Sequence, residues 1–539
     1  MSGITESFSS GVTFQYSAVA SMFISSSIFY FFIAHVLPVD IVGSISLLYA
    51  IMNIMAVVFV FGLSNGIQHY LSYHLVRENH SAIMRLMRQT IAFSLLLALA
   101  AFIFMYFASG EIAMLFFHSS AYILSIKLIG IAIAGSVMIN VFGAMLLGLN
   151  QYKKYSLIYI FINIFTYFFP LSMLFLTGQS VYLIAGLASI NMLSAMLFLI
   201  FVYRIYGRLS GLQTKSVKEP YHNLIYYSIP LFFSSIMGTS ATYIDRIVVS
   251  YFINLSFLGI YNFALIIASA AAFLVTPVSN LLIPKLSTFF SLDNKEDFRN
   301  SIRILLNIVS LIYIPAALGI AALSRIILFE FAGIAYTMAY LPLIIIMFVT
   351  SVFIGTTVLA SGISSIRKTK IFIYSSGFAL ASNVILSVIL IPRFNIIGAA
   401  IAYSSMNAVN FVIVYYYSRK FGVNNYDISR IVKIWISSLI MFGIIFTIQG
   451  LFPYTMINIF IYILGGFLIY LAEIKIFHLI SQEEMGYIIS VIPDRFGTIK
   501  YLTKNLAYNE KKVESLGISK LETGATRRDA ADAIISAKL

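Results

Sequence analysis

The sequence predicts an all-α polytopic membrane protein with about 14 transmembrane helices, arranged as two parallel six-helix pseudo-repeat lobes plus two extra helices. Three observations support this fold class. Apolar residues make up 60% and charged residues 10% of the 539 residues, proportions outside those of soluble domains. Successive apolar stretches reach the roughly 20 residues that a helix needs to cross a hydrocarbon core. Motifs of the first half also recur in the second half at a nearly constant offset.

The predicted spans follow the apolar stretches in chain order. In the first half they cover 14–35, 41–63, 89–109, 121–147, 155–177 and 181–203. In the second half they cover 224–252, 258–283, 302–324, 337–361, 371–391 and 397–418. Two further spans, 431–450 and 456–477, have no counterpart in the first half.

Breaks in the apolar pattern divide the chain into four predicted parts. The longest polar break inside the apolar body covers 204–222 and separates the two lobes. The parts are therefore the N-lobe (1–222), the C-lobe (223–420), the last two spans (421–480) and a polar cytoplasmic tail (481–539). A short amphipathic helix is expected early in the tail, between Glu483 and Pro493.

The repeat is visible in residues that are uncommon inside spans. Ser64–Asn65 recurs as Ser279–Asn280, 215 positions later, and Gly43 recurs as Gly259, 216 positions later. Evenly spaced basic loops arising by chance are the alternative explanation; they account for matched Lys and Arg, but less easily for matched Ser–Asn and Gly. Because each repeat has an even number of spans, both lobes should have the same orientation, related by an axis along the membrane normal.

Basic residues are concentrated in one set of connections. They include Arg77, Arg85, Arg88, Lys153, Lys154, Arg204, Arg208, Lys285, Lys295, Arg299, Arg303, Arg367 and Lys368. The opposite connections offer only Arg325 and Arg393. Positively charged loops stay cytoplasmic, which predicts a plasma-membrane protein with both termini in the cytoplasm. The net charge of +14 is then explained by loops facing anionic headgroups, and no nucleic-acid partner is expected.

The sequence lacks the residues that several classes of chemistry require. The chain has no cysteine, so it offers no disulfide, thiolate metal site or cysteine nucleophile. It contains neither a phosphate-binding P-loop sequence nor a His-Glu-x-x-His metal motif. No catalytic residue, metal or cofactor is therefore predicted, and the protein is not expected to be an enzyme.

Charged residues inside predicted spans are the main candidates for a binding site. Asp245 and Arg246 lie well inside the span 224–252, where an ionised side chain costs roughly 2.5–3.5 kcal/mol on insertion scales. One interpretation is a structural pair or a polar cap at the outer end of the helix. The other is that Arg246 faces a cavity and binds an anionic substrate group, with Asp245 as its partner or as an ion site.

Three further cations are weaker candidates. Lys127 enters the span 121–147 near its outer end and either snorkels to headgroups or meets a phosphate in an outward-open cavity. His69 and Lys285 occupy equivalent positions at the cytoplasmic ends of spans two and eight. They are either ordinary interfacial residues or the mouth of an inward-facing cavity.

A series of short motifs carries a family resemblance over residues 10–480. They are Phe61-Gly62-Leu63-Ser64, Gly148-Leu149-Asn150-Gln151-Tyr152-Lys153, Ser228-Ile229-Pro230, Ile244-Asp245-Arg246-Ile247, Leu258-Gly259-Ile260-Tyr261-Asn262 and Ile283-Pro284-Lys285-Leu286-Ser287. In this order, and with a plan of six, six and two spans, the chain resembles the polysaccharide and lipid-linked oligosaccharide flippases. These belong to the multidrug/oligosaccharidyl-lipid/polysaccharide exporter superfamily.

The resemblance implies alternating access by two lobes. A glycan linked to polyprenyl phosphate or pyrophosphate would be taken up on the cytoplasmic side and released outside, with Arg246 and Lys127 as phosphate or sugar contacts. Membrane lipids and glycan-assembly enzymes are the other candidate partners. The first predicted span lacks the acidic residue that the drug-exporting branch often uses for ion coupling, since Asp40 lies beyond it. Spans one, two and eight contain no Lys or Arg between their ends, unlike the cation-rich cavity of the peptidoglycan-precursor branch.

Two other functions remain open at this stage. One is a cation-coupled multidrug or metabolite exporter of the same fold. The other is a membrane-embedded glycan polymerase or glycosyltransferase, which would be expected to carry a sizeable outer loop with clustered carboxylates or arginines. The outer connections offer only Asp40, Glu111, Arg325, Glu330 and Arg393.

Overall fold

The computed structural model describes residues 8–210, 221–273, 295–366, 368–424 and 426–480, together with Val275, Leu286 and Phe290. Contacts divide the chain into two units, 1–466 and 467–539. Of the second unit, only 467–480 is described. The predicted tail 481–539, with its amphipathic helix, lies outside the described residues. Throughout the described ranges the regular secondary structure is helical, which confirms the all-α fold class.

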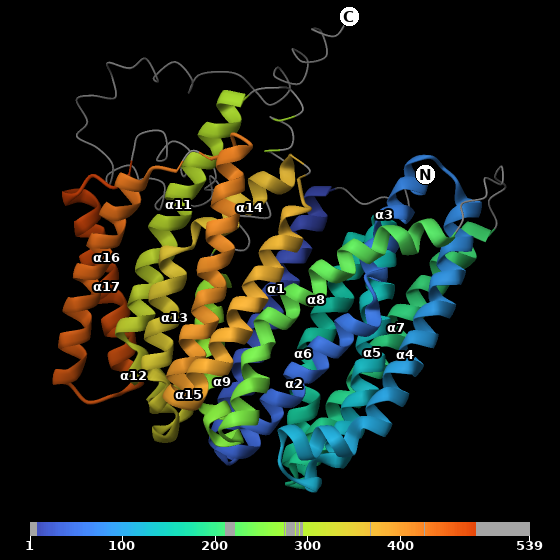
Figure 1. Ribbon diagram of the computed structural model, residues 1–539, viewed down its shortest axis with the longest axis horizontal. Helices are drawn as coiled ribbons and strands as arrows, with labels where there is room; N and C mark the ends of the chain where they lie inside the picture. Colours follow the sequence, from blue (N-terminus) through green and yellow to red (C-terminus); the bar gives the residue numbers. More distant parts are fainter. Residues whose placement is uncertain are drawn as a thin grey trace, which may run out of the picture. The chain divides into compact units, whose positions relative to one another are not determined.

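The first half of the chain forms seven α-helices and one short 3₁₀ turn (Figure 1). The helices are α1 (Phe8–Val36), α2 (Val39–Val60), α3 (Leu63–Val76), α4 (His80–Phe116), α5 (Ile123–Gly148), α6 (Tyr152–Thr177) and α7 (Ser180–Ser210), with η1 (Ser120–Tyr122) before α5.

The described second half begins with α8 and contains two further 3₁₀ turns. Its helices are α8 (Tyr221–Phe252), α9 (Leu255–Phe273), α11 (Lys295–Ala322), α12 (Ser324–Ala332), α13 (Tyr340–Val352), α14 (Gly355–Ser365), α15 (Ile371–Lys420), α16 (Ile428–Ile448) and α17 (Met456–Ile476). The 3₁₀ turns are η2 (Ile334–Ala339) and η3 (Gln449–Leu451).

Among the described residues, 11 helices are long and apolar enough to cross a membrane, so the chain is a multi-pass membrane protein. Two other predicted spans correspond to shorter apolar segments, Ala20–Val36 and Leu255–Ala271. The 50-residue helix α15 covers two predicted spans and is interrupted at Asn395 (φ 52°, ψ −135°). Pro392 precedes this break and cannot continue the helical hydrogen bonding. The count of 14 spans stays a prediction.

Two predicted spans end differently in the structure. The span 41–63 stops at Phe61 and Gly62, both of which have left-handed backbone (φ 51° and 68°), and the chain continues as the separate helix α3. The span 337–361 is divided between η2, α13 and α14. The sequence around each break stays apolar on its N-terminal side up to the break itself, so the apolar pattern alone did not locate the break.

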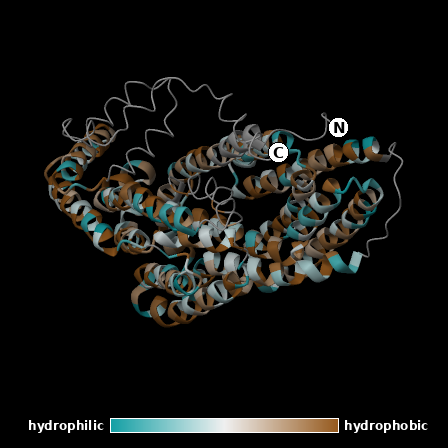
Figure 2. Cartoon of the chain, turned by 90° about the horizontal axis from the view of Figure 1, so that it is seen from above, coloured by the Kyte–Doolittle hydropathy of each residue, from teal (hydrophilic) through white to brown (hydrophobic). Residues whose placement is uncertain are grey.

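The surface of the helices is apolar, as a bilayer requires. Large hydrophobic side chains such as Leu96 (61% exposed), Phe107 (79%) and Tyr203 (70%) point away from the protein interior. Figure 2 shows apolar colouring over much of the length of the helices. Exposed apolar area on this scale is not tolerated on a soluble monomer, whereas helices satisfy their own backbone hydrogen bonds and can face lipid.

Small residues let the helices approach closely. A Cβ atom built on Gly135 of α5 would lie 2.8 Å from the Asn191 carbonyl carbon of α7, and one on Gly130 would lie 2.8 Å from Cβ of Met105 in α4. Helix α5 thereby packs against both α4 and α7 (Figure 1). Packing of this kind, rather than burial from water, holds membrane helices together.

Several helices of the first repeat contact the second, and two of these contacts lie near opposite ends of the helices. At the end with short connections, α2 crosses α9 at Gly43 and Gly259, which are each other's counterparts in the repeat. A Cβ atom on Gly43 would overlap the Leu255 carbonyl oxygen and lie 2.9 Å from the Gly259 nitrogen; one on Gly259 would overlap the Val39 carbonyl oxygen. We call this contact the glycine crossing.

At the end that carries the basic connections, α3 packs against α8. A Cβ atom on Gly66 would overlap Oγ of Ser228. The ring of His69 stacks on that of Tyr227, with centroids 4.5 Å apart and an interplanar angle of 14°. We call this contact the basic-end contact. The repeats therefore touch near both ends of their helices.

Candidate functional site

Two charged residues lie inside the apolar helix α8, in its C-terminal third. Asp245 and Arg246 are adjacent in α8, with side chains 0% and 12% exposed. Their closest charged atoms, Arg246 Nη1 and Asp245 Oδ1, are 3.7 Å apart. Each charge has a counter-charge close by, which offsets part of the desolvation penalty.

The guanidinium of Arg246 is held on one side only. Its Nε donates to Oδ1 of Asn262 in α9 at 3.2 Å, and its Nη1 donates to the Thr242 carbonyl oxygen at 2.8 Å. Its Nη2 makes no hydrogen bond with any residue that the structure describes. The guanidinium is therefore fixed in orientation and retains donors for a further acceptor. A fork of this kind matches phosphate or carboxylate oxygens.

Asp245 has a different place in the same cluster. Its Oδ2 accepts the hydroxyl of Tyr261 at 2.6 Å, and its Oδ1 accepts the backbone N–H of Arg246 at 2.9 Å. Because the carboxylate is fully enclosed, it has no surface for a substrate in this conformation. Asp245 therefore positions and balances Arg246, in agreement with the partner role that the sequence suggested for it.

Four tyrosines lie around the guanidinium, one from α8 itself and one each from α1, α9 and α15. Tyr243 places its ring centroid 4.8 Å from the Arg246 Cζ. Tyr30 of α1 and Tyr403 of α15 lie close enough to interact with the Arg246 charge. Tyr261 completes the group. Tyrosine offers both a flat apolar face and a hydroxyl that donates and accepts, the combination that suits sugar rings.

The side-chain amide of Asn262 lies beside the Tyr30 hydroxyl and makes no close hydrogen bond through its nitrogen. Asn262 is 3% exposed, and a buried amide donor without a close acceptor costs about 1–3 kcal/mol. Together with Nη2 of Arg246, it gives the cluster donors for an oxygen-rich ligand.

Within the described ranges, no group of three or more His, Cys, Asp or Glu side chains could hold a metal ion. We refer to Arg246, Asp245, Tyr261, Asn262 and Tyr243 as the arginine cluster.

The other predicted site residues lie elsewhere. Lys127 places Nζ 4.3 Å from the ring centroid of Tyr106 in α4, and the contacts of Lys127 and Arg246 have no residue in common. The exposed side of α4 around Tyr106 (45% exposed) suits the snorkelling interpretation. His69 belongs to the basic-end contact through Tyr227. Lys285 lies outside the described residues.

Sequence reasoning missed most of the tyrosines. Tyr261 and Asn262 stood in one of the motifs that carry the family resemblance. Tyr30, Tyr243 and Tyr403 had no distinguishing signal, because the chain contains 35 tyrosines. Only the rotation of each helix decides which of them face Arg246.

Removing the Tyr261 hydroxyl should destabilise the cluster. We expect Tyr261→Phe to lose about 1–3 kcal/mol of unfolding free energy, because Oδ2 of the buried Asp245 is left without a donor. Thermal unfolding of the purified protein measures this loss. Tyr251→Phe is the matched control, since Tyr251 is 46% exposed in the last turn of α8, the helix that carries Asp245. Equal unfolding midpoints for the two variants would contradict the assigned hydrogen bond.

Comparison with known families places this geometry in context. A family model described as "Polysaccharide biosynthesis protein" matches residues 10–290. A relative from Haloferax volcanii, named "Probable low-salt glycan biosynthesis flippase Agl15", is 26% identical over 289 residues. That match covers 53% of this chain and 61% of the relative, so the chain spans less than two thirds of the relative's length.

Solved structures share the fold. The lipid II flippase MurJ in an inward closed conformation matches with a TM-score of 0.65 and 18% identity, covering 83% of this chain and 98% of that one. An inward-facing multidrug transporter of the MATE family and MOP superfamily matches with a TM-score of 0.61 and 13% identity, covering 74% and 94%. At these identities the likeness concerns the fold.

Proposed function

The chain belongs to the polysaccharide biosynthesis protein family, and on that premise we propose that it is a membrane flippase. It moves a lipid-linked oligosaccharide or polysaccharide precursor from the cytoplasmic to the outer leaflet of the plasma membrane. The relative named as a glycan biosynthesis flippase and the fold shared with a lipid II flippase support this assignment.

The arginine cluster is the observation that carries the proposal. An arginine buried in the membrane, held by Asn262 and Thr242 on one side, offers donors for the phosphate that links a glycan to its lipid. The surrounding tyrosines suit the first sugars. The polyprenyl chain would stay in the bilayer, since each CH₂ withdrawn from lipid costs about 0.8 kcal/mol.

Alternating access follows from the two contacts between the repeats. Opening the basic-end contact would expose the arginine cluster to the cytoplasm, and opening the glycine crossing would expose it to the outside. Both contacts join the first repeat to the second, so a rocking motion of one repeat against the other opens one while it closes the other. The basic loops at the α3–α8 end support a cytoplasmic location for that end.

A cation-coupled multidrug or metabolite exporter of the same fold is the second candidate. The fold shared with a multidrug transporter and the buried carboxylate of Asp245 favour it. In that case Asp245 would exchange Arg246 for a substrate or coupling cation.

Deleting the gene separates the two candidates. A flippase predicts loss of surface glycan and accumulation of the lipid-linked precursor in the cytoplasmic leaflet, measured by its resistance to a membrane-impermeant glycosidase in intact cells. An exporter predicts an intact glycan and reduced efflux of a cationic dye such as ethidium from everted vesicles. If the precursor reaches the outer leaflet at the normal rate without the protein, the flippase assignment is wrong.

A further inference from the structure

A cavity lined by polar and apolar residues lies at the end of the helices with basic connections. None of its lining residues belongs to the arginine cluster. The cavity has a volume of about 370 Å³ and is lined by the first turn of α11, the C-terminal end of α14 and the residues that follow α15. This volume falls in the range of small-molecule pockets, about 300–1,000 Å³. Three of its lining residues are cations: Lys295, Arg299 and Lys420.

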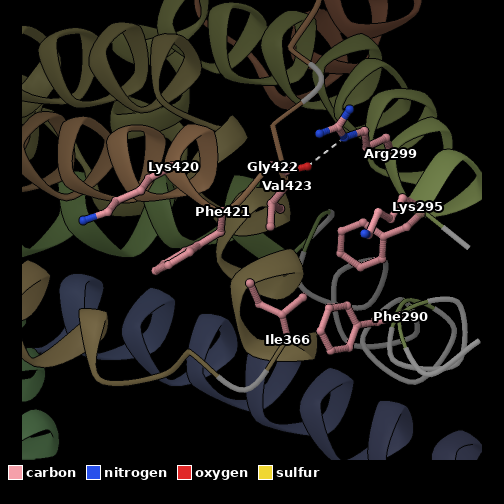
Figure 3. Close-up of a pocket in the computed structure, with 9 residues that line it drawn as sticks. Phe290, Lys295, Arg299, Ile366, Lys420, Phe421, Gly422 and Val423 are labelled. Atoms are coloured by element: carbon pink, nitrogen blue, oxygen red, sulfur yellow. Dashed lines mark hydrogen bonds between the residues drawn. The ribbon is translucent and has the colours of Figure 1, made fainter. Parts of the chain in front are cut away.

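Figure 3 shows how these side chains lie. Lys295 and Arg299, one helical turn apart on α11, stand on the same side of the cavity, whereas the Lys420 side chain extends away from them. Nε of Arg299 donates to the Gly422 carbonyl oxygen at 2.9 Å, which fixes the plane of the guanidinium. Both α11 cations are exposed, so a ligand can reach them. The neighbouring carboxylates of Glu296 and Asp297 do not line the cavity.

The rest of the lining is apolar. Phe298 and Val423 are buried in the wall (5% and 1% exposed), and the rings of Phe290 and Phe298 lie with their centroids 6.3 Å apart. Cations beside aromatic and aliphatic surface suit a ligand that is anionic at one end and apolar at the other. Basic pockets between membrane helices on the cytoplasmic side bind lipid headgroups for this reason.

The first repeat provides an internal comparison. Its equivalent pocket is lined by Leu75, Gln151 and Ile205, which lie 215, 215 and 216 positions before Phe290, Ile366 and Phe421. That pocket has a volume of about 20 Å³, little more than one water molecule occupies. Nζ of Lys154 donates to Oε1 of Gln151 at 2.6 Å across it.

The cations that line the two pockets come from different helices: Lys295 and Arg299 of α11 and Lys420 of α15 in the second pocket, and Lys154 of α6 and Arg208 of α7 in the first. The positions equivalent to Lys295 and Arg299 are His80, which is buried, and Met84. The two pockets thus lie at equivalent places, and the second is the larger and is the one with cations of its long helix, α11, in its lining. Shared ancestry explains the common location, but it does not explain the larger volume or the placement of Lys295 and Arg299 in the wall.

We propose that this cavity binds a phosphate group, with Lys295 and Arg299 as its ligands, and that the apolar wall selects the headgroup of an anionic phospholipid. The site is separate from the arginine cluster and does not depend on the proposed transport function. Bound lipid would tie the start of α11 to the end of α15.

Lipid binding to the purified full-length protein tests the proposal. The probes are dioleoylphosphatidylglycerol, dioleoylphosphatidylcholine and sodium pyrophosphate, and the readouts are native mass spectrometry and the thermal unfolding midpoint. We expect phosphatidylglycerol to bind the wild type, and the Lys295→Gln/Arg299→Gln variant to bind it at least about tenfold more weakly. The matched control, Lys154→Gln/Arg208→Gln, removes the same charge from the first-repeat pocket and should bind like the wild type.

A second variant tests whether the loss of binding comes from the cavity itself or only from the changed surface charge or a folding defect. Ile366→Trp fills the cavity while both cations remain, and it should also lose phosphatidylglycerol. If these substitutions weaken the binding of pyrophosphate but not of phosphatidylglycerol, the cavity is a phosphate site whose ligand is a soluble molecule and not a lipid. If both variants bind phosphatidylglycerol and pyrophosphate as tightly as the wild type, the cavity is not a phosphate site.

Discussion

Replacing Arg246 by alanine should reduce flipping of the lipid-linked precursor on the order of 100-fold, or about 2.7 kcal/mol of barrier. The guanidinium of Arg246 keeps hydrogen-bond donors that no described residue accepts. The other charged group of the arginine cluster, Asp245, is fully enclosed and cannot contact a substrate in this conformation. The assay is translocation in proteoliposomes that contain the reconstituted protein and a labelled precursor.

The single substitution has a second consequence that must be separated from the first. It leaves the Asp245 carboxylate buried without a counter-charge, and breaking a buried pair in this way typically destabilises a protein by about 3–5 kcal/mol. The Asp245→Asn/Arg246→Ala double variant removes that penalty. We expect it to recover the unfolding midpoint of the wild type without recovering transport.

Two further variants complete the series. Arg246→Lys keeps the charge but replaces the planar fork with a point charge, so transport should fall less than in Arg246→Ala. Arg393→Ala removes an exposed arginine and should behave like the wild type. Normal flipping by the double variant would exclude both residues from the substrate site.

Adding one methyl group at the glycine crossing should block transport by a different route. In Gly43→Ala the new Cβ would overlap the Leu255 carbonyl oxygen, and in Gly259→Ala it would overlap the Val39 carbonyl oxygen. Overlap with backbone cannot be relieved by a side-chain rotation, so α2 and α9 must separate. We expect a decrease in flipping of at least about tenfold for either variant.

Gly110→Ala is the matched control for these variants. Gly110 lies in α4, and a Cβ atom built on it has nothing within 4 Å. Because alanine favours a helix over glycine by about 1 kcal/mol, this variant should be slightly more stable and should transport normally.

Labelling reports whether the crossing has opened. The chain has no cysteine, so a single cysteine can be introduced at Val42, which is 0% exposed beside Gly43. A membrane-impermeant maleimide should label it slowly in the otherwise wild-type protein and faster in the Gly259→Ala background. Unchanged labelling together with normal flipping would show that the crossing does not control access.

Some residues of the site were predictable from the sequence, because the free-energy cost of a charge in a membrane span depends on that residue alone. Asp245 and Arg246 stand out in any reading of the sequence, since a charge in a membrane span is expensive wherever its neighbours lie. Gly43 and Gly259 were paired by their offset, and the structure brings them into contact. Lys127 was a weaker candidate by the same rule, and it lies against Tyr106, because the rotation of α5 decides which way its side chain points.

The sequence by itself determined the class of this protein, its apolar helices, its internal repeat and its buried charges. Each of these follows from composition, from spacing along one helix or from the energy of one residue in a bilayer. The tertiary structure decided that Tyr261 and Asn262 hold Asp245 and Arg246 and that Asn395 divides α15. It also decided that the second copy of a duplicated pocket is much larger than the first. These depend on how helices rotate and cross. Apolar residues on every face of a membrane helix leave that rotation undetermined until small residues and polar groups meet in the packed molecule.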